Sequence, residues 1–256
     1  MQKNQIEREE KSWLSFFGIE EMPNVNSIEA FTDTLFDVME RPEFFALKSF
    51  DPNYMAELMY NGFLPMALEL PTGSIFLTPK LHYERCLLYF DKLHIPKSLK
   101  KKSKQFSITF DMAVDKVFEG CLEQHEESWL YKPLRDALLK LFQNTKQKVS
   151  FHSIELWLDK KLVAGEIGYT VGSCYTSLSG FYTINSSGTI QMVGAALLLK
   201  KLGFSFWDLG MYMSYKENLG AELVPGQSFV RSLRKIRDNK APIFPKNEIF
   251  VRELLV

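Results

Sequence analysis

The stretch SFHSIELWLDKKLVAGEIGYTVGSCYTSLSGFYT, which begins at Ser150, constrains the fold more than any other part of the chain. Apolar residues alternate in it with small or polar ones, as in half-buried strands. Turn residues interrupt the run twice, at 159–161 and at 171–173. The pattern predicts three antiparallel strands at residues 151–158, 162–170 and 174–183. The second half of the chain must therefore be built around successive hairpins.

A helix and two shorter elements follow these strands. The helix is predicted at residues 189–202, because Gly203 can end it and lysines occupy its last turn. Residues 204–208 then form a short buried strand, and residues 228–237 form a final helix. The order strand, strand, helix, strand is typical of an α+β domain.

The first half of the chain contains shorter elements. Asp51 can cap a helix that Asn61 and the following glycine end. An alternating strand is predicted at 106–110, and amphipathic helices are predicted at 112–124 and 131–144. An earlier helix is predicted from four apolar residues that share one face: Phe31, Leu35, Val38 and Met39.

The composition argues against several classes of protein. The formal net charge is zero, so any contact with nucleic acid must come from local patches. The three cysteines lie far apart without a CxxC pair, which argues against a disulfide framework or a zinc site. No apolar run reaches the length of a membrane span, and the charged N-terminus does not resemble a secretory signal. We therefore expect a cytoplasmic protein without a membrane segment.

Eight short strings carry a resemblance to a known family. They are LHIPKS (93–98), SITFDMAVDKVFEGC (107–121), ESWL (127–130), HSIELW (152–157), LVAGEIGY (162–169), SLSGFY (177–182), WDLG (207–210) and NLGAELVP (218–225). In this order and spacing, the chain from about residue 52 to residue 237 resembles the leucyl/phenylalanyl-tRNA–protein transferase family.

The resemblance implies a fold and a division of the chain. It implies an α+β protein in which a small N-terminal α+β domain joins a GNAT-like domain with a mixed or antiparallel sheet and flanking helices. We place the small domain at 51–105 and the GNAT-like aminoacyl-transfer domain at 106–256. Residues 1–50 match nothing in the family pattern and form a divergent N-terminal extension.

The resemblance also implies an activity. The family takes Leu, Phe or Met from a charged tRNA and joins it to a protein that begins with Arg or Lys, which marks that protein for degradation. The ester is already activated, so an amine can attack it without ATP, a metal or another cofactor. The implied partners are an aminoacyl-tRNA and a protein or peptide with a basic N-terminal residue, and we expect a monomer.

Asp208 is the candidate catalytic residue, because it matches the aspartate proposed as the family's catalytic acid. It follows two aromatic residues at the end of a buried strand. In the functional interpretation it helps to remove a proton from the attacking amine. In the alternative interpretation it caps the turn after the strand through backbone N–H groups.

The position two residues later departs from the family. The family carries a glutamine there, and this chain carries Gly210, which offers only a backbone N–H and permissive dihedral angles. Either backbone, water or the tRNA's ribose hydroxyl replaces the glutamine, or the chain runs a different reaction.

A second departure involves the hairpin. The family has a pocket glutamate on the second hairpin strand and a methionine facing it on the first. Here Leu178 stands at the glutamate position and Glu166 at the methionine position. Because both lie equally far from Gly172, we expect them to be opposite each other on one face, so that the acid has changed strand. The alternative is a solvated Glu166 and a core Leu178.

The remaining pocket positions are mostly aromatic or small. Tyr175, Phe181 and Trp129 match aromatic family positions, although a single aromatic residue is more often part of a core. Gly180 and Met66 stand where the family has larger side chains, which implies a roomier pocket. Thr189 matches the family at the start of the predicted helix, after an Asn-Ser-Ser-Gly string that can bind phosphate or simply cap the helix.

Two basic runs are candidates for tRNA binding. Five lysines occur within eight residues, which gives a local positive field suited to a phosphate backbone. The last helix carries a second basic face. A solvated charged surface is the ordinary alternative for either run. The predicted tRNA-binding residues are Lys97, Lys100, Lys101, Lys102, Lys104, Arg231 and Arg234.

Three functions remain open from the sequence. The first is aminoacyl transfer from Leu-, Phe- or Met-tRNA to a basic N-terminus. The second is a related GNAT-like acyltransferase with a different donor or acceptor. The third is a non-catalytic homologue that binds charged tRNA or an N-terminal degron.

Overall fold

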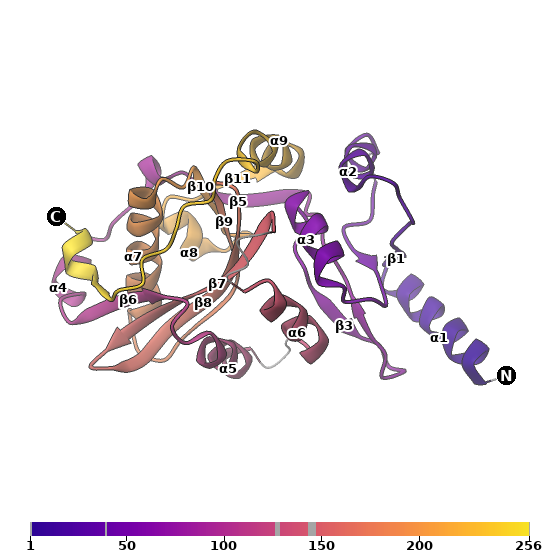
Figure 1. The fold of residues 1–256 in the computed structure, drawn as a ribbon, viewed down its shortest axis with the longest axis horizontal. Helices are drawn as coiled ribbons and strands as arrows, with labels where there is room; N and C mark the ends of the chain where they lie inside the picture. The colour runs from indigo at the N-terminus through magenta and orange to yellow at the C-terminus, as the bar shows by residue number, and fades with distance from the viewer. Residues whose placement is uncertain (1, 39, 126–128, 143–146, 256) are drawn as a thin grey trace.

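The computed structural model describes residues 2–38, 40–125, 129–142 and 147–255. One eight-stranded sheet runs through most of the molecule, in the order β11-β5-β10-β9-β8-β7-β6-β12 (Figure 1). Among the described strands, β9 and β10 pair in parallel and all other neighbours in this sheet are antiparallel. Its strands are β5 (Glu84–Leu88), β6 (Phe106–Phe110), β7 (Val149–Leu158), β8 (Lys161–Val171), β9 (Cys174–Tyr182), β10 (Phe206–Asp208), β11 (Glu222–Pro225) and β12 (Ile249–Phe250).

Helices cover both faces of this sheet. On one face, α5 (Val114–Gln124) and α6 (Lys132–Lys140) bury apolar side chains against β7, β8 and β9. On the other face, α7 (Ser187–Leu202) packs against the same strands with its own apolar core. The remaining helices are the short α4 (Leu99–Lys102) and α8 (Ser214–Asn218) and the last helix α9 (Gly226–Ile236). Two 3₁₀ turns span Phe90–Lys92 and Val251–Leu254.

The N-terminal part is made of small elements, and its first helix projects from the body (Figure 1). Strands β1 and β2 pair in parallel, and β3 and β4 form an antiparallel pair. The elements are α1 (Gln2–Phe16), β1 (Glu20–Glu21), α2 (Ile28–Phe36), β2 (Phe45–Ala46), α3 (Pro52–Tyr60), β3 (Ala67–Glu69) and β4 (Ile75–Leu77).

The α+β class, the three hairpin strands and the flanking helices are confirmed. The Asp51 side chain accepts a hydrogen bond from the Tyr54 N–H at 2.8 Å and caps α3 as expected, and Gly62 takes a positive φ of 96° just after it. Gly203 ends α7 in the same left-handed conformation. Helix α6 ends at Lys140, earlier than predicted. Residues 127–128 and 143–144 and Met39, which belong to predicted features, lie outside the described residues.

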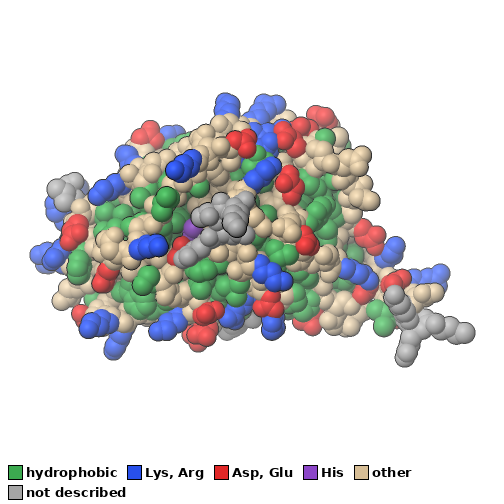
Figure 2. Space-filling view, viewed as in Figure 1, with side chains coloured by type: hydrophobic (Ala, Val, Ile, Leu, Met, Phe, Trp, Pro, Cys, Tyr) green, Lys and Arg blue, Asp and Glu red, His purple; other side chains and the backbone are tan. Residues whose placement is uncertain are grey.

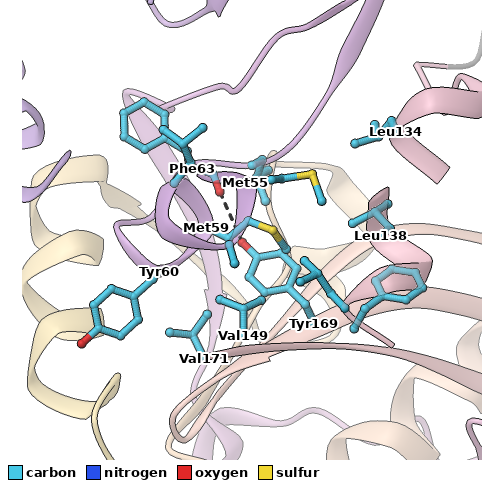
Figure 3. Close-up of a cluster of buried hydrophobic side chains, with 14 of the residues drawn as sticks. Met55, Met59, Tyr60, Phe63, Leu134, Leu138, Val149, Tyr169 and Val171 are labelled. Atoms are coloured by element: carbon cyan, nitrogen blue, oxygen red, sulfur yellow. Dashed lines mark hydrogen bonds between the residues drawn. The ribbon is translucent and has the colours of Figure 1, made fainter. Parts of the chain in front are cut away.

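The boundary proposed at residue 105 does not match the sheet. Strand β5 lies before that boundary, yet it pairs with β10 and β11 inside the large sheet. The two parts also share a core, since Met55, Met59 and Phe63 of the first part pack with residues of β7, β8 and α6 (Figure 3). In that core the Tyr169 hydroxyl donates to the Phe63 carbonyl at 3.5 Å. The region 51–105 is therefore continuous with the main fold and does not form a separate packing unit.

None of the described helices is both long enough and apolar enough to cross a bilayer.

Candidate functional site

Asp208 lies at the end of β10 and is fully buried. Its carboxylate forms a two-point ion pair with Arg85 of β5, in which Nε lies 2.9 Å from Oδ1 and Nη2 lies 2.8 Å from Oδ2. Two further donors complete the shell: the Thr176 hydroxyl at 3.1 Å and the Gly210 N–H at 3.0 Å. Four donors thus surround the two carboxylate oxygens.

This geometry revises the role expected for Asp208. A carboxylate with four donors and no exposed surface has no free lone pair directed at an incoming amine in this conformation. Arg85 is itself only 1% exposed, and its guanidinium also stacks 4.5 Å from the Phe229 ring centre. Burial alone would lower the pKa of Arg85, but the Asp208 carboxylate outweighs it and raises that pKa. The pair joins two strands and is suited to positioning.

Gly210 takes a φ of +73°, a conformation that side chains rarely allow. Its N–H donates to Asp208, and its carbonyl accepts from the Cys86 N–H at 2.8 Å. A Cβ at this position would meet only the Leu64 side chain, at 3.6 Å. There is therefore room for a side chain beside the backbone. A residue other than glycine would be destabilising here because of the positive φ, and not because of a steric clash.

A polar group lies where β9 and β10 part. The two strands pair only from Phe206–Asp208 to residues 174–176, and β9 continues beyond them. There the Trp207 indole N–H donates to the Ser177 hydroxyl at 2.7 Å, and that hydroxyl donates to Glu166 of β8 at 3.0 Å. The parting of the strands leaves polar side chains facing inward.

Glu166 is 5% exposed and keeps few hydrogen bonds for a buried carboxyl. Burial raises its pKa to about 7, against the smaller opposing effects of Ser177, Tyr175 and Gln191. The Tyr175 hydroxyl and the Gln191 side-chain nitrogen are also buried; both act on Glu166 as donors that favour its charged form, but neither reaches ordinary hydrogen-bond geometry with a described residue. Buried polar atoms with imperfect hydrogen bonds lower stability. In chemical terms, the Glu166 carboxyl at this position can accept a hydrogen bond from an ammonium.

The predicted exchange of Glu166 and Leu178 across the hairpin is wrong. A β-bulge lies between Ile167 and Gly168, and it shifts the register so that Glu166 pairs with Gly180. Leu178 packs into the core under α5 and α6, whereas the partners of Glu166 lie on the α7 face. One inserted residue moves a side chain to the opposite face of a sheet, which counting from the turn could not reveal.

The same bulge divides the predicted aminoacyl pocket. Tyr175 lies on the α7 face, with Glu166. Phe181 and Trp129 lie on the other face, where the Phe181 ring fills the space above Gly120. These two aromatic residues and Leu178 are therefore core positions and do not line the polar group. Thr189 is exposed in the first turn of α7, and half-buried Met66 accepts a hydrogen bond from the Thr78 N–H through its carbonyl.

The lysine run lies at an exposed end of the molecule. All five predicted lysines, from Lys97 to Lys104, are exposed in and around α4. Lysine and arginine side chains are visible at the left end of Figure 2, where Figure 1 places α4. The Lys102 ammonium donates to the Ser186 hydroxyl at 3.3 Å, so the run lies beside the loop that begins α7. The exposed run and the Asn-Ser-Ser-Gly loop thus form one surface.

The second basic face is used differently. Arg231 is exposed, but Arg234 bonds Asp33 at 2.7 Å and the Glu29 carbonyl at 3.2 Å, both on α2. Arg237 pairs with the Glu29 carboxylate at 2.5 Å. These contacts fasten the N-terminal extension to α9. Arg234 is therefore removed from the predicted tRNA-binding surface, because its charge is already neutralised.

A polar cavity of about 420 Å³ lies beside these contacts and away from Glu166. It is lined by the segment 25–29, by Tyr54, Glu57 and Tyr60 of α3, and by Lys148 and Arg237. Both cations stack on the Tyr60 ring, with Lys148 at 4.1 Å and Arg237 at 4.3 Å from its centre. Two of its charged groups, Arg237 and Glu29, pair with each other.

Sequence reasoning missed several residues of the site. Arg85, Gln191 and Lys216 belonged to no motif, because each is polar and isolated in its own segment, and Ser177 was part of the string SLSGFY without being singled out. The ERCLL segment (84–88) carried one signal for Arg85: a charged residue within a strand-like apolar run needs a buried partner. Lys216, between Tyr215 and Glu217, carried no such signal. Within the described chain, no group of three or more His, Cys, Asp or Glu residues could hold a metal ion.

The comparisons with known proteins bear on this arrangement. A family model described as leucyl/phenylalanyl-tRNA protein transferase matches residues 87–234, which is more than half of the chain. The chain belongs to this family. A leucyl/phenylalanyl-tRNA–protein transferase of Stutzerimonas stutzeri is 28% identical over 154 residues, which are 58% of this chain and 66% of that protein. One of Zymomonas mobilis is 27% identical over 190 residues, which are 72% of this chain and 68% of that protein.

The family match covers most of the site described above, although Arg85 lies just before the matched residues. The matched region includes β10, the hairpin of β8 and β9, and most of α9, but not α1 to α3. The matches span about two thirds of the length of these two relatives. Among solved structures, the C-terminal domain of a putative lysylphosphatidylglycerol synthetase from Agrobacterium fabrum shares 13% identity and a TM-score of 0.39, covering 75% of this chain and 73% of that one.

The Arg85–Asp208 pair gives a prediction about stability. We expect Arg85→Met or Asp208→Leu alone to lower the free energy of unfolding by about 3–5 kcal/mol, because each leaves a buried charge or donor unpaired. The double variant Arg85→Met/Asp208→Leu should recover much of this loss. Denaturant unfolding measures all three. Lys132→Met, which breaks the exposed Lys132–Asp136 pair, is the control and should cost less than about 1 kcal/mol. Additive losses in the double variant would show that the two side chains are not coupled.

The raised pKa of Glu166 gives a second prediction, about pH. The folded state holds the proton more tightly than the unfolded state, whose pKa is the ordinary 4.5. The stability that protonated Glu166 contributes is therefore fully present below the unfolded-state pKa of 4.5. It is lost as the pH rises through the folded-state pKa of about 7. Relative to Glu166→Gln, the wild type should lose roughly 2–3 kcal/mol of unfolding free energy between about pH 5 and about pH 8. Glu69→Gln, at an exposed position, is the control. A wild-type curve parallel to that of Glu166→Gln would contradict the assignment.

Proposed function

We propose that the chain transfers Leu, Phe or Met from its tRNA to the N-terminal Arg or Lys of a protein. Family membership supports a tRNA–protein aminoacyltransferase in general. The observation that carries the proposal to particular residues is the buried Glu166 with a raised pKa, beside the Tyr175 hydroxyl and the Gln191 amide, which act on it without reaching ordinary hydrogen-bond geometry among the described residues. An aminoacyl group carries an ammonium, which the Glu166 carboxylate can bind, and a carbonyl, which can accept a hydrogen bond from a neighbouring donor.

Glu166 is the proposed anchor for the aminoacyl ammonium. A bound cation would favour the charged carboxylate and lower the pKa that burial has raised. The Tyr175 hydroxyl and the Gln191 amide would supply polar contacts to the same head group. Tyr175 and Trp207 form the aromatic lining beside it, with ring centres 6.1 Å apart. Binding here would fix the donor and orient its ester bond.

The proposed reaction is direct aminolysis. The neutral α-amine of the acceptor attacks the ester carbonyl carbon, and a carbon–nitrogen bond forms. The bond from that carbon to the ribose oxygen then breaks. One proton leaves the amine nitrogen and one reaches the ribose oxygen, so the products are an amide and a tRNA with a free hydroxyl. No oxidant, metal or nucleotide is consumed, and the protein acts by positioning and by charge.

Asp208 acts as a positioning residue in this proposal. It fixes β10 against β5 and, through the Gly210 N–H, fixes the start of the loop beyond β10. Gly210 offers backbone groups where the family has a side chain. The tRNA acceptor arm would lie on Lys97, Lys100, Lys101, Lys102 and Lys104, with Thr189 and Ser186 beside them. The product would enter N-degron-dependent degradation, and the reaction would take place in the cytoplasm on a monomeric enzyme.

The open space at Gly210 supports one alternative. A site without the family's glutamine side chain is also suited to a related acyltransferase with a different donor or acceptor. A non-catalytic homologue that binds charged tRNA or a degron would keep the same fold.

A transfer assay tests the proposal. Labelled Leu-, Phe- and Met-tRNA are incubated with the protein and a peptide that begins with Arg, and we expect label on the peptide's N-terminus. An acetylated copy of the peptide is the control, because it lacks the attacking amine. Glu166→Gln should reduce transfer at least about tenfold, as expected for a lost charged contact. Absence of product with all three tRNAs refutes the proposal. Coenzyme A-dependent acylation would indicate the related acyltransferase, and tight tRNA binding without turnover would indicate the non-catalytic homologue.

A further inference from the structure

Lys216 is a buried lysine that neither the sequence motifs nor the proposed reaction uses. It lies on α8, directly after the loop that leaves β10, and is only 8% exposed. Its ammonium donates to the Leu209 carbonyl at 2.6 Å and to the Met211 carbonyl at 2.7 Å. These two carbonyls flank Gly210. The cation is therefore held at the turn that follows Asp208.

The contacts of this ammonium leave one donor uncommitted. An ammonium has three N–H donors, and the hydrogen bonds within the described chain use two of them. The aromatic ring of Tyr215 lies 5.8 Å from the nitrogen and gives only a weak further interaction. Burying a cation whose described contacts are neutral carbonyls costs desolvation free energy. A ligand that places negative charge beside the Lys216 ammonium would offset this free energy.

Two carboxyl groups and a thiol on neighbouring strands act electrostatically on this cation. Burial lowers the pKa of Lys216, and Cys86, Asp208 and Glu166 oppose that effect. Asp208 is already neutralised by Arg85. Glu166 connects to β10 through the Ser177 and Trp207 hydrogen bonds, and Lys216 binds the same strand's continuation at Leu209. The acid and the cation thus connect, through hydrogen bonds, to the same strand and its continuation.

We propose that Lys216 binds the carbonyl oxygen of the aminoacyl ester and stabilises the negative charge that develops there during attack. This inference rests on the proposed aminoacyl transfer and assigns it a further catalytic residue. Glu166 takes the ammonium end of the aminoacyl head group, and Lys216 takes its carbonyl end. The Lys216 ammonium meets a full negative charge only when the ester carbonyl oxygen becomes anionic. It therefore stabilises the transition state more than the bound ester.

The competing explanation is a purely structural one. In it, Lys216 only ties the carbonyls of Leu209 and Met211 together and so shapes the loop around Gly210. A structural lysine would affect the binding of all ligands equally. A lysine that stabilises developing charge would distinguish a neutral carbonyl from an anionic oxygen at the same place.

Two mimics make that distinction. The first is an aminoacyl-adenosine in which an amide replaces the ester, with a neutral carbonyl. The second is the corresponding aminoalkylphosphonate, with an anionic oxygen at the carbonyl position. We expect Lys216→Met to weaken binding of the phosphonate about 100-fold and binding of the amide less than about threefold. In the transfer assay, kcat should fall about 100-fold while KM changes little. Calorimetry and steady-state kinetics measure these quantities.

Further variants guard against misfolding. Lys216→Arg keeps a cation and should retain most of the preference for the phosphonate, whereas Lys216→Gln keeps only a neutral donor and should lose most of it. Lys116→Met, at an exposed position on α5, is the matched control and should behave as the wild type. Thermal unfolding establishes which variants are folded. If Lys216→Met does not fold, the comparison of the Arg and Gln variants decides.

The outcomes separate this inference from the proposed function. Equal losses for both mimics, or a fall in kcat/KM that comes from KM alone, would overturn the role of Lys216 and leave aminoacyl transfer standing. A wild type that prefers the phosphonate through Lys216 but gives no peptide product would support the role of Lys216 and refute the proposed acceptor. A wild type that binds neither mimic would overturn both.

Discussion

The ion pair between Arg85 and Asp208 is the interaction on which the arrangement of the site depends. It joins β5, from the first part of the chain, to β10, from the last part, in the interior of the sheet. Separating the two strands would leave a buried charge without its partner, which would cost about 3–5 kcal/mol of stability. The pair therefore holds β5 and β10 in a fixed position relative to each other. The loop that begins at Gly210 and the lysine on α8 take their positions from that fixed strand end. Asp208 therefore contributes to function by positioning the end of β10 and the loop that follows it.

Around this pair, the chain keeps imperfectly satisfied polar groups in its interior. Glu166 is buried with a raised pKa, the Tyr175 hydroxyl and the Gln191 amide act on it without reaching ordinary hydrogen-bond geometry among the described residues, and Lys216 contacts neutral carbonyls. Such groups lower stability when no ligand is present. Their gathering where β9 and β10 part is what a site prepared for a small dipolar group requires. The proposed function and the role of Lys216 both rest on this one property of the interior.

Much of the fold could be predicted from local pattern, whereas the site could be predicted only in part. Alternation and turn residues located the hairpins, and Asp51 and Gly203 located helix ends, because these signals act over a few residues. The pairing of Glu166 could not be found in this way, since a bulge between Ile167 and Gly168 shifts the register without a sequence marker. The partners Arg85–Asp208 and Arg234–Asp33 are separated by long stretches of chain, and only the tertiary structure brings them together.

The most direct test of this account is a crystal structure of the protein with a non-hydrolysable aminoacyl-adenosine amide. The account predicts that the ligand's ammonium lies within hydrogen-bonding distance of the Glu166 carboxylate, on the α7 face of the sheet. It also predicts that the bond between Arg85 and Asp208 stays intact. A ligand ammonium bound to Asp208 with that ion pair broken, or a ligand seated away from Glu166, would contradict it.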